Sequence, residues 1–206
     1  MCGRFSFIPG YQTLLWEFGE IEFIKKPEAN YNVAPQQFAN VIQKTDKVVM
    51  DKFEWGYEIG ARKVINTRLD SLKEKTIFHD SFKNRRVLVP ASGYFEWKQA
   101  GTRKVPYYFH PKEGYFGLAG IYDKENRFSI ITTNADKKIE SIHERMPVIV
   151  KREDYSKWLD QKTDVKDLLS ILGDTRKDLQ FDIVSTDVNN VKNNSPDLIE
   201  PVKGLF

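Results

Sequence analysis

Short segments rich in β-branched and aromatic residues recur along most of this chain, and they constrain its fold more than any other feature. Segments of this kind, bounded by turn residues, are typical of β-strands. Helical patterns are few and short by comparison. The sequence therefore predicts an α+β, mainly-β domain with a barrel-like arrangement. The predicted strands are Phe38–Gln43, Lys47–Tyr57, Val64–Arg68, Arg86–Pro90, Tyr94–Lys98, Pro106–His110, Tyr115–Tyr122, Phe128–Thr133, Pro147–Val150 and Phe181–Ser185.

The remaining segments predict short helices and loops. A brief helix is expected between Pro9 and Gly19, where Gly19 ends it. Asn30–Pro35 is predicted to be a turn-rich loop, and residues 189–206 a polar tail. No repeat, low-complexity tract or linker interrupts the chain, so we expect one domain over residues 1–206. Further helical turns are predicted at Asp70–Phe82, Glu153–Leu159 and Asp164–Leu172.

Composition excludes several classes of protein. Hydrophobic residues make up 40% of the 206 residues, enough for a packed core, and the formal net charge is only +3. No apolar run approaches the length of a membrane span, and the start of the chain lacks the layout of a signal peptide. We expect a soluble monomer of the cytoplasm with no membrane partner, associated with the nucleoid if it is bacterial.

Cofactor and metal signatures are missing as well. The chain has no glycine-rich phosphate loop, dinucleotide fingerprint or Gly-x-Ser-x-Gly elbow. Its three histidines are scattered, and a single cysteine cannot build a zinc cluster or an internal disulfide. We therefore expect neither a cofactor nor a metal ion.

The single cysteine, Cys2, follows the initiator methionine. Removal of Met1 would leave an α-amine and a thiol on one residue, a pair that attacks aldehydes. The pKa of an α-amine is about 7.7–8.0 and that of a lysine about 10.4, so the α-amine holds far more free base at neutral pH. The amine would form a Schiff base, and the thiol could close it into a thiazolidine. The plainer alternative is that Cys2 is a small buried hydrophobic residue.

Three further segments carry reactive groups. In Ser92–Lys98, strand alternation places Tyr94, Glu96 and Lys98 on one face and directs Phe95 and Trp97 toward a core. A carboxylate against aromatic residues is partly desolvated, which raises its pKa and suits proton transfer. The plainer alternative is an exposed Glu96 paired with Lys98.

The other two segments are Ile142–Pro147 and Ile65–Arg68. His143 precedes a proline-bearing strand, and its ordinary pKa near 6.5 allows proton donation and acceptance at neutral pH. Asn66 and Arg68 share one face of an extended segment, where an amide can orient a substrate and an arginine can bind phosphate. Ordinary surface or capping roles are the alternatives for all three side chains.

Taken together, these motifs resemble those of the SOS response-associated peptidase (SRAP) family. The resemblance rests on Met-Cys-Gly-Arg-Phe at the start, Asn-Tyr-Asn-Val-Ala-Pro, Ile-Asn-Thr-Arg, Gly-Tyr-Phe-Glu-Trp-Lys and Ile-His-Glu-Arg-Met-Pro. It runs from Cys2 to about Val150, with a looser match in the tail. The combination of the first motif with Phe-Glu-Trp-Lys and His-x-Arg-x-Pro is very specific.

The resemblance implies a covalent reaction with abasic sites in single-stranded DNA, whose open-chain sugar is an aldehyde. Cys2 would be the nucleophile after autoproteolytic loss of Met1, and its adduct a thiazolidine. Asn66 would hold the N-terminus or the sugar. Glu96 would shuttle protons, and His143 would help to open the sugar ring. Strand cleavage by β-elimination would be a side reaction.

The resemblance also implies DNA contacts. Arg4, Arg68 and Arg145 match positions that face the phosphate backbone. Trp55 and the loop from Asn32 to Pro35 match residues that line the path of the strand, where an aromatic face can stack on bases. Core packing is the alternative for Trp55. The segment after Trp55-Gly56-Tyr57 is shorter than in bacterial relatives, so the base-wedging surface is reduced here or replaced by Arg62 and Lys63.

Two other functions compete with this one. A cysteine peptidase using Cys2, His143 and Glu96 would turn over peptides and would need the thiol rather than the amine. A non-covalent module for single-stranded DNA would bind in a salt-sensitive way, and replacement of Cys2 would not affect it.

Overall fold

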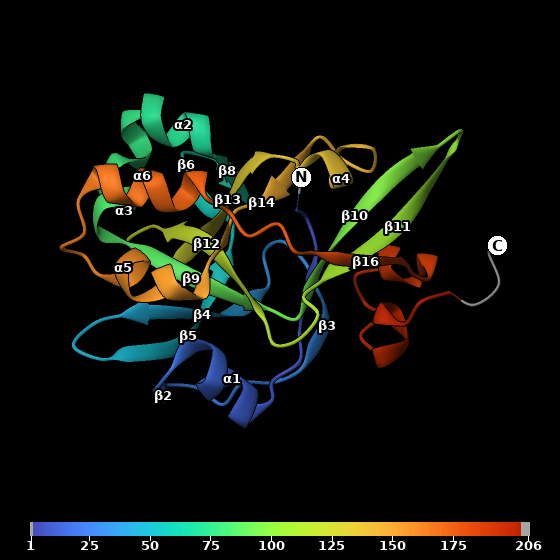
Figure 1. Ribbon diagram of the computed structural model, residues 1–206, viewed down its shortest axis with the longest axis horizontal. Helices are drawn as coiled ribbons and strands as arrows, with labels where there is room; N and C mark the ends of the chain where they lie inside the picture. Colours follow the sequence, from blue (N-terminus) through green and yellow to red (C-terminus); the bar gives the residue numbers. More distant parts are fainter. Residues whose placement is uncertain (1, 203–206) are drawn as a thin grey trace.

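The computed structural model describes residues 2–202, so Met1 and the end of the predicted tail, residues 203–206, lie outside the described residues. β-Strands are the main regular structure of the described chain and form two large sheets and one small hairpin (Figure 1). The strands are β1 Phe5–Phe7, β2 Glu22–Phe23, β3 Asn30–Val33, β4 Phe38–Lys44, β5 Val48–Trp55, β6 Tyr57–Ile59, β7 Arg62–Val64, β8 Asn66–Arg68, β9 Arg86–Ala91, β10 Gly93–Ala100, β11 Arg103–His110, β12 Phe116–Tyr122, β13 Arg127–Asn134, β14 Arg145–Pro147, β15 Ile149–Val150 and β16 Gln180–Ile183.

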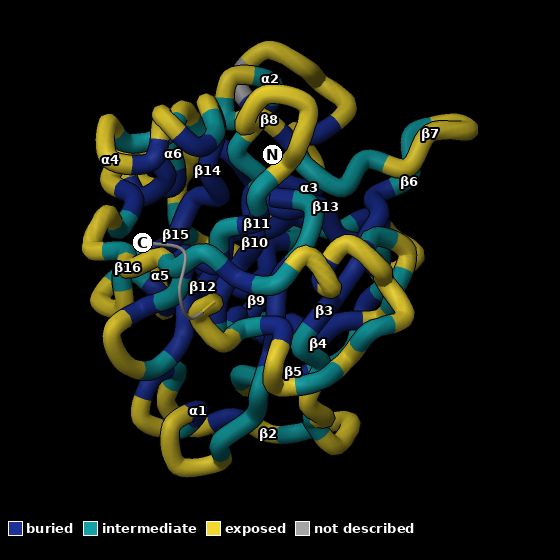
Figure 2. The backbone as a smooth tube through the Cα atoms, turned by 90° about the vertical axis from the view of Figure 1, so that its right-hand side faces the viewer, coloured by how far each residue is buried: buried dark blue, intermediate teal, exposed yellow. Residues whose placement is uncertain are grey.

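The larger sheet closes on itself. Its strands follow the order β14–β13–β12–β9–β4–β5–β2, and β5 also pairs with β13. Phe128 of β13 lies opposite Trp55 of β5 in that parallel pair. The path β5–β4–β9–β12–β13 therefore forms a ring, which leaves those strands without free edges. This closure confirms the predicted barrel-like α+β architecture. Figure 2 shows β9 and β12 as largely buried strands in the body of the molecule.

The smaller sheet has the order β16–β11–β10–β1–β3. Both faces of β10 are covered at its start. Tyr94 belongs to a buried cluster with Cys2 and Phe109, whereas Phe95 belongs to a separate cluster with Val188. The predicted alternation along this strand is confirmed, but the core lies on both sides of it. The sheet therefore brings the start of the chain into the interior.

Helices are short and lie around the sheets. α5 and α6 lie beside the larger sheet, on the same side of the molecule as α2 and α3 (Figure 1). Among residues 2–202, no helix is both long and apolar enough to cross a membrane. The helices are α1 Tyr11–Phe18, α2 Leu69–Glu74, α3 His79–Asn84, α4 Lys137–Glu140, α5 Tyr155–Leu159 and α6 Val165–Gly173, and the 3₁₀ turns are η1 Thr76–Phe78, η2 Arg152–Asp154, η3 Thr186–Asn189 and η4 Pro196–Ile199.

One prediction about the chain path is wrong. Asn30–Pro35 is not a loop throughout, because residues 30–33 form β3 and pair with β1, with Val33 opposite Phe5. Asparagine disfavours strands when it is solvated, but the Asn32 side chain is buried and hydrogen-bonded here. These tertiary contacts outweigh the local turn preference of the segment. The short elements β1 and α4 were not predicted at all.

Gly93 marks the crossing from the larger sheet to the smaller one. A Cβ atom at this position would lie 2.4 Å from the Tyr108 ring and 2.5 Å from the Phe109 carbonyl oxygen. We expect Gly93→Ala to lower the free energy of unfolding by about 1–3 kcal/mol, because the ring and backbone would both have to move. Gly173→Ala is the matched control, since nothing lies within 4 Å of its added methyl group. Equal urea midpoints for the two variants would contradict this close approach.

Candidate active site

Strand pairing carries Cys2 into the interior. Phe5 of β1 lies opposite Tyr94 of β10, and the Phe95 amide donates a hydrogen bond to the Arg4 carbonyl at 2.9 Å. Cys2 precedes this pair and is fully buried. In Figure 1 the start of the described chain lies between β14 and β10. The position of Cys2 is therefore set by the backbone hydrogen bonds of the residues that follow it, not by contacts of its own side chain.

Asn66 fixes the backbone of Cys2 from the larger sheet. It begins β8, which pairs in parallel with β13 so that Asn66 lies opposite Ile130. Its side-chain Nδ2 donates to the Cys2 carbonyl oxygen at 2.8 Å. Its Oδ1 is buried and accepts no hydrogen bond from any of residues 2–202. The Asn66 Oδ1 atom can therefore accept a hydrogen bond from the α-amine of Cys2, while Nδ2 of the same side chain donates to the Cys2 carbonyl.

Glu96 and His143 meet beside Cys2. Glu96 lies on β10 and is 2% exposed, whereas His143 lies in the turn between α4 and β14. The His143 Nε2 atom is 3.9 Å from Glu96 Oε2. The Arg145 backbone amide donates to His143 Nδ1 at 3.0 Å. In a neutral ring the proton is therefore on Nε2, the nitrogen that faces Glu96.

Burial sets the protonation of these groups. It raises the pKa of the Glu96 carboxyl to about 7 and lowers the pKa of His143. Near neutral pH the carboxyl can thus give or take a proton, while the imidazole is mainly neutral. Burial, together with the Glu96 charge, raises the pKa of the Cys2 thiol. The sulfur therefore stays protonated until a base removes its proton.

A pocket of about 420 Å³ opens on Glu96 and His143. Its other lining residues come from the segment before β1, from β10 and β11, and from η3 near the C-terminus. Trp97 donates a hydrogen bond from its indole nitrogen to Asn189 Oδ1 at 2.7 Å. This bond joins β10 to the C-terminal part of the chain at one wall of the pocket. Sequence reasoning directed Trp97 to a core and assigned no role to Lys104 or Asn189, because only the fold brings them here. The lining residues are Arg4, Glu96, Trp97, Lys104, His143 and Asn189.

Arg4 and Asn32 hold residues 188–193, near the C-terminus, against this pocket. Arg4 Nη1 donates to Asn32 Oδ1 at 2.7 Å and to the Val188 carbonyl at 2.9 Å. Asn32 Nδ2 contacts the carbonyl oxygens of Asn190 and Asn193 at 3.0 and 2.9 Å. Asn32 is 1% exposed, which corrects its predicted place along the path of the DNA. A phosphate contact by Arg4, a residue of the pocket wall, stays a prediction.

The other predicted DNA contacts differ in their exposure. Arg68 is exposed and lies 3.7 Å from Asp70, and Pro35 is partly exposed, so both predictions stay open. Arg145 is buried, and its guanidinium donates to the carbonyl and hydroxyl oxygens of Thr132 at 2.7 and 3.0 Å. This internal position does not fit the predicted phosphate contact of Arg145.

Trp55 lies in the core, which contradicts the prediction that it stacks on bases. It is fully buried and packs edge-on against Phe5 at 5.1 Å and parallel to Phe128 at 6.2 Å. Its indole nitrogen donates to the Ile65 carbonyl at 2.9 Å, one residue before Asn66. Trp55 therefore supports the active site from inside the barrel.

We expect Trp55→Ala to lower the free energy of unfolding by about 3–5 kcal/mol, the usual loss when a buried aromatic side chain is truncated. Trp16→Ala is the matched control, because Trp16 is 55% exposed and has Arg152 over its ring. Its loss should amount to about 1 kcal/mol or less. Urea unfolding measures both values. Equal losses for the two variants would contradict the buried position of Trp55.

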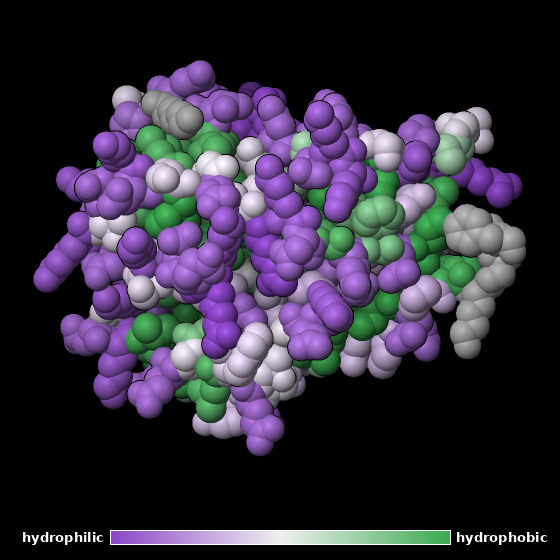
Figure 3. Space-filling view, in the orientation of Figure 1, coloured by the Kyte–Doolittle hydropathy of each residue, from purple (hydrophilic) through white to green (hydrophobic). Residues whose placement is uncertain are grey.

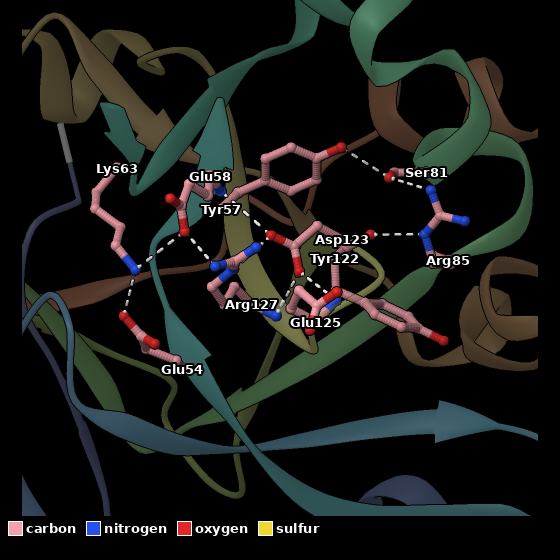
Figure 4. Close-up of polar contacts among 10 residues, drawn as sticks. All are labelled: Glu54, Tyr57, Glu58, Lys63, Ser81, Arg85, Tyr122, Asp123, Glu125 and Arg127. Atoms are coloured by element: carbon pink, nitrogen blue, oxygen red, sulfur yellow. Dashed lines mark hydrogen bonds and ion pairs between the residues drawn. The ribbon is translucent and has the colours of Figure 1, made fainter. Parts of the chain in front are cut away.

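The short segment after Trp55 forms the β6–β7 hairpin, which projects from the body of the molecule in Figure 2. Figure 4 shows a network of ion pairs at its base. Lys63 lies 2.8 Å from Glu54 and 3.7 Å from Glu58, and Arg127 pairs with Glu58 and Asp123. The charge of Lys63 is thus offset within the hairpin. Arg62 is exposed, and it remains the candidate for contacts with DNA here.

The face of the molecule in Figure 3 is mainly polar. In Figure 3 hydrophilic side chains cover most of the visible face, and hydrophobic residues appear in small groups between them. Exposed apolar residues such as Tyr11 and Phe38 come from different parts of the chain, a pattern that is ordinary for globular proteins.

The fold and the site define a class: a strand-rich α+β protein in which a buried cysteine near the start of the chain lies close to a buried glutamate that pairs with a partly buried histidine. This chain belongs to the SOS response associated peptidase (SRAP) family, whose model matches residues 1–191. It is 34% identical to the abasic site processing protein YoqW of Bacillus subtilis, over 97% of this chain and 99% of that protein. It is 29% identical to the abasic site processing protein YedK of Escherichia coli, over 98% of this chain and the whole of that protein.

Solved structures share the fold. A Bacteroides thetaiotaomicron protein has 28% sequence identity and a TM-score of 0.72, covering 84% of this chain and 85% of its own. A phage-related protein of Bordetella bronchiseptica has 22% identity and a TM-score of 0.78, covering 90% and 95%. The second likeness concerns the fold alone. The family and fold predictions are therefore confirmed, whereas the roles of the site residues stay predictions.

Proposed function

We propose that this protein captures abasic sites in single-stranded DNA by forming a covalent bond between Cys2 and the aldehyde of the open sugar. The observation that carries the proposal is that Asn66 holds the Cys2 carbonyl, the Glu96 charge acts on the Cys2 thiol, and His143 lies 3.9 Å from Glu96. The names of the curated relatives, abasic site processing proteins, support the same substrate.

The reaction requires that Met1 is removed first. With Met1 attached, the Cys2 nitrogen is an amide and cannot form a Schiff base. Hydrolysis of the Met1–Cys2 peptide bond consumes one water and releases methionine and the α-amine. Cys2 and Glu96 are the proposed participants in this autoproteolytic step, because the carboxyl can donate or accept a proton near neutral pH.

Ring opening precedes the capture of the sugar. An abasic sugar is mostly a closed hemiacetal, and opening it needs a proton on the ring oxygen and a base at the hydroxyl of C1. The proposed proton donor is the protonated form of His143, the minor form near neutral pH, through its Nε2, which borders the pocket beside Glu96. The ring C–O bond then breaks, and the C1 hydroxyl loses its proton as the aldehyde forms.

The proposed capture has two steps. The Cys2 amine adds to the aldehyde carbon, and the resulting carbinolamine loses one water, with Glu96 supplying the proton that the hydroxyl needs to leave. The Cys2 sulfur then adds to the imine carbon. The C=N electron pair moves to nitrogen, which takes up a proton as sulfur loses one, and a thiazolidine results. β-Elimination from the imine would give strand cleavage as a side reaction.

The state of the thiol weighs against a cysteine peptidase. A thiol peptidase needs a low thiol pKa so that thiolate is present at neutral pH. Here burial and the Glu96 charge both raise the pKa of the Cys2 thiol. The site thus suits attack by an amine first and by sulfur second.

The test uses three single-stranded oligonucleotides: one with an abasic site, one intact and one with a tetrahydrofuran site that lacks the aldehyde. We expect a band that survives denaturation with the abasic oligonucleotide alone. A variant with a bulky residue inserted before Cys2, so that Cys2 never becomes the N-terminus, should give no such band. Equal, salt-sensitive binding of all three oligonucleotides without any covalent band would favour the non-covalent module instead.

A further inference from the structure

Tyr94 carries a buried hydroxyl for which the fold alone gives no reason. The residue is fully buried on β10, two positions before Glu96. Its ring stacks on Phe109 with centroids 4.9 Å apart and an angle of 9° between the ring planes. The hydroxyl oxygen has no hydrogen-bond partner among residues 2–202. Leaving a buried hydroxyl unpaired is unfavourable, and phenylalanine would fill the same space without that penalty.

The surroundings of this hydroxyl are those of the reaction centre. Tyr94 and Cys2 belong to the same buried cluster, and alternation along β10 puts Tyr94 on the face that carries Glu96. Besides burial, the charges that act on Tyr94 are those of Cys2 and Glu96, and together they raise its pKa well above the ordinary value. The hydroxyl therefore remains protonated and can act only as a neutral hydrogen-bond donor or acceptor.

Nearby tyrosine hydroxyls are placed differently. Tyr108 lies on the adjacent strand β11, and its hydroxyl is 2.7 Å from Ser6 Oγ. Tyr57 lies in a separate buried cluster, and its hydroxyl is 2.9 Å from Ser81 Oγ. Both are buried and both are paired. Buried tyrosines in this protein can thus be satisfied by a serine, and the exception shares its buried cluster with Cys2.

We propose that Tyr94 is a further catalytic residue whose hydroxyl donates a hydrogen bond to the Cys2 sulfur while that sulfur adds to the imine carbon. The inference rests on the proposed function and concerns its second step only. As the thiol gives up its proton, negative charge develops on sulfur in an interior that offers little solvation. A donor held in place beforehand stabilises that charge more effectively than one that must reorganise.

The experiment compares wild type, Tyr94→Phe and the matched control Tyr108→Phe on an abasic single-stranded oligonucleotide. Borohydride added at successive times reduces the imine to a stable amine, so the amount of trapped adduct measures the rate of the first step. The intensity of the band that survives denaturation without borohydride measures the rate of ring closure. We expect Tyr94→Phe to form imine at the wild-type rate and to close it about 10- to 100-fold more slowly, the range for a hydrogen bond to a developing charge. Tyr108→Phe should leave both rates unchanged.

Thermal unfolding separates this role from a structural one. Tyr94→Phe should unfold at the wild-type temperature or above it, because it removes an unpaired buried group. Tyr108→Phe should unfold at a lower temperature, because it leaves Ser6 unpaired. A lower unfolding temperature for Tyr94→Phe would show that its hydroxyl has a structural partner and would overturn the inference.

The remaining outcomes are also decisive. Closure at the wild-type rate in Tyr94→Phe, or an equal slowing of both steps, would overturn the role of Tyr94 and leave the proposed function standing. If processed wild type gives neither imine nor stable adduct, the proposed function fails and the inference fails with it.

Discussion

Cys2→Ala is expected to abolish the DNA adduct that survives denaturation, the largest effect of any single substitution in this protein. The substitution removes the sulfur and keeps the α-amine, because alanine after Met1 is also small enough for Met1 to be removed. An imine can still form but cannot close to the thiazolidine. The measurement is a denaturing gel with an abasic single strand, with and without borohydride.

Borohydride distinguishes the role of the amine from that of the sulfur. We expect Cys2→Ala to show no band without borohydride and a clear band with it, which would assign imine formation to the amine and the lasting bond to sulfur. Cys2→Ser is the matched control for size, since the oxygen analogue of a thiazolidine opens more readily in water. A stable band from Cys2→Ala in the absence of borohydride would mean that another residue forms the crosslink.

Glu96→Gln is expected to slow adduct formation by about 10²- to 10⁴-fold, the usual contribution of a general acid–base. Glutamine keeps the shape and hydrogen-bonding capacity of the side chain but cannot exchange a proton with the carbinolamine. Glu17→Gln is the matched control, because Glu17 is also buried and its pKa is also raised by burial. Glu17 pairs with Tyr155 rather than with the site residues, so this variant should react at the wild-type rate.

The same substitution should stabilise the fold in alkaline solution. The pKa of the Glu96 carboxyl rises from its ordinary value of 4.5 to about 7 on folding. Below 4.5 the group is protonated in both states and has no effect on stability. Stability falls as the pH rises from about 4.5 to about 7, because the unfolded state ionises there while the folded protein keeps the group protonated, and it levels off above that range. By about pH 8 the penalty is on the order of 3 kcal/mol, and Glu96→Gln should remove it.

Urea unfolding of wild type and Glu96→Gln near pH 5 and near pH 8 measures this effect. The account predicts similar midpoints at the lower pH and a higher midpoint for the variant at the upper pH. A variant that is less stable at the upper pH would contradict a carboxyl whose charged form is disfavoured by burial, even if its reaction were slow.

Local patterns in the sequence predicted the strands well and pointed to residues that the fold brings close together. Segments rich in β-branched and aromatic residues predicted β4, β5 and β9–β13, because those strands are the long ones. The motifs around Cys2, Glu96 and His143 predicted a shared site, and the structure brings the three together. Those signals are local, so they are readable without knowledge of the fold.

The errors concern residues whose environment is set by distant parts of the chain. Trp55 was assigned to a DNA surface, but closure of the barrel between β5 and β13 encloses it. Asn32 is held by carbonyl groups about 160 residues further along the chain. Asn189, a lining residue of the pocket, was likewise not predictable, because its partner Trp97 lies 92 residues earlier in the chain. Tyr94 was placed on the correct face, but its unpaired hydroxyl is visible only in three dimensions.

Peptide mapping of the purified DNA adduct by tandem mass spectrometry tests the central claim most directly. Digestion with nuclease and trypsin should yield Cys2-Gly3-Arg4 without Met1, carrying the sugar remnant. Its sulfur should resist iodoacetamide, because both the amine and the sulfur are bonded to the same sugar carbon. A remnant on a lysine peptide, or an adduct in which the Cys2 sulfur is freely alkylated, would contradict the account.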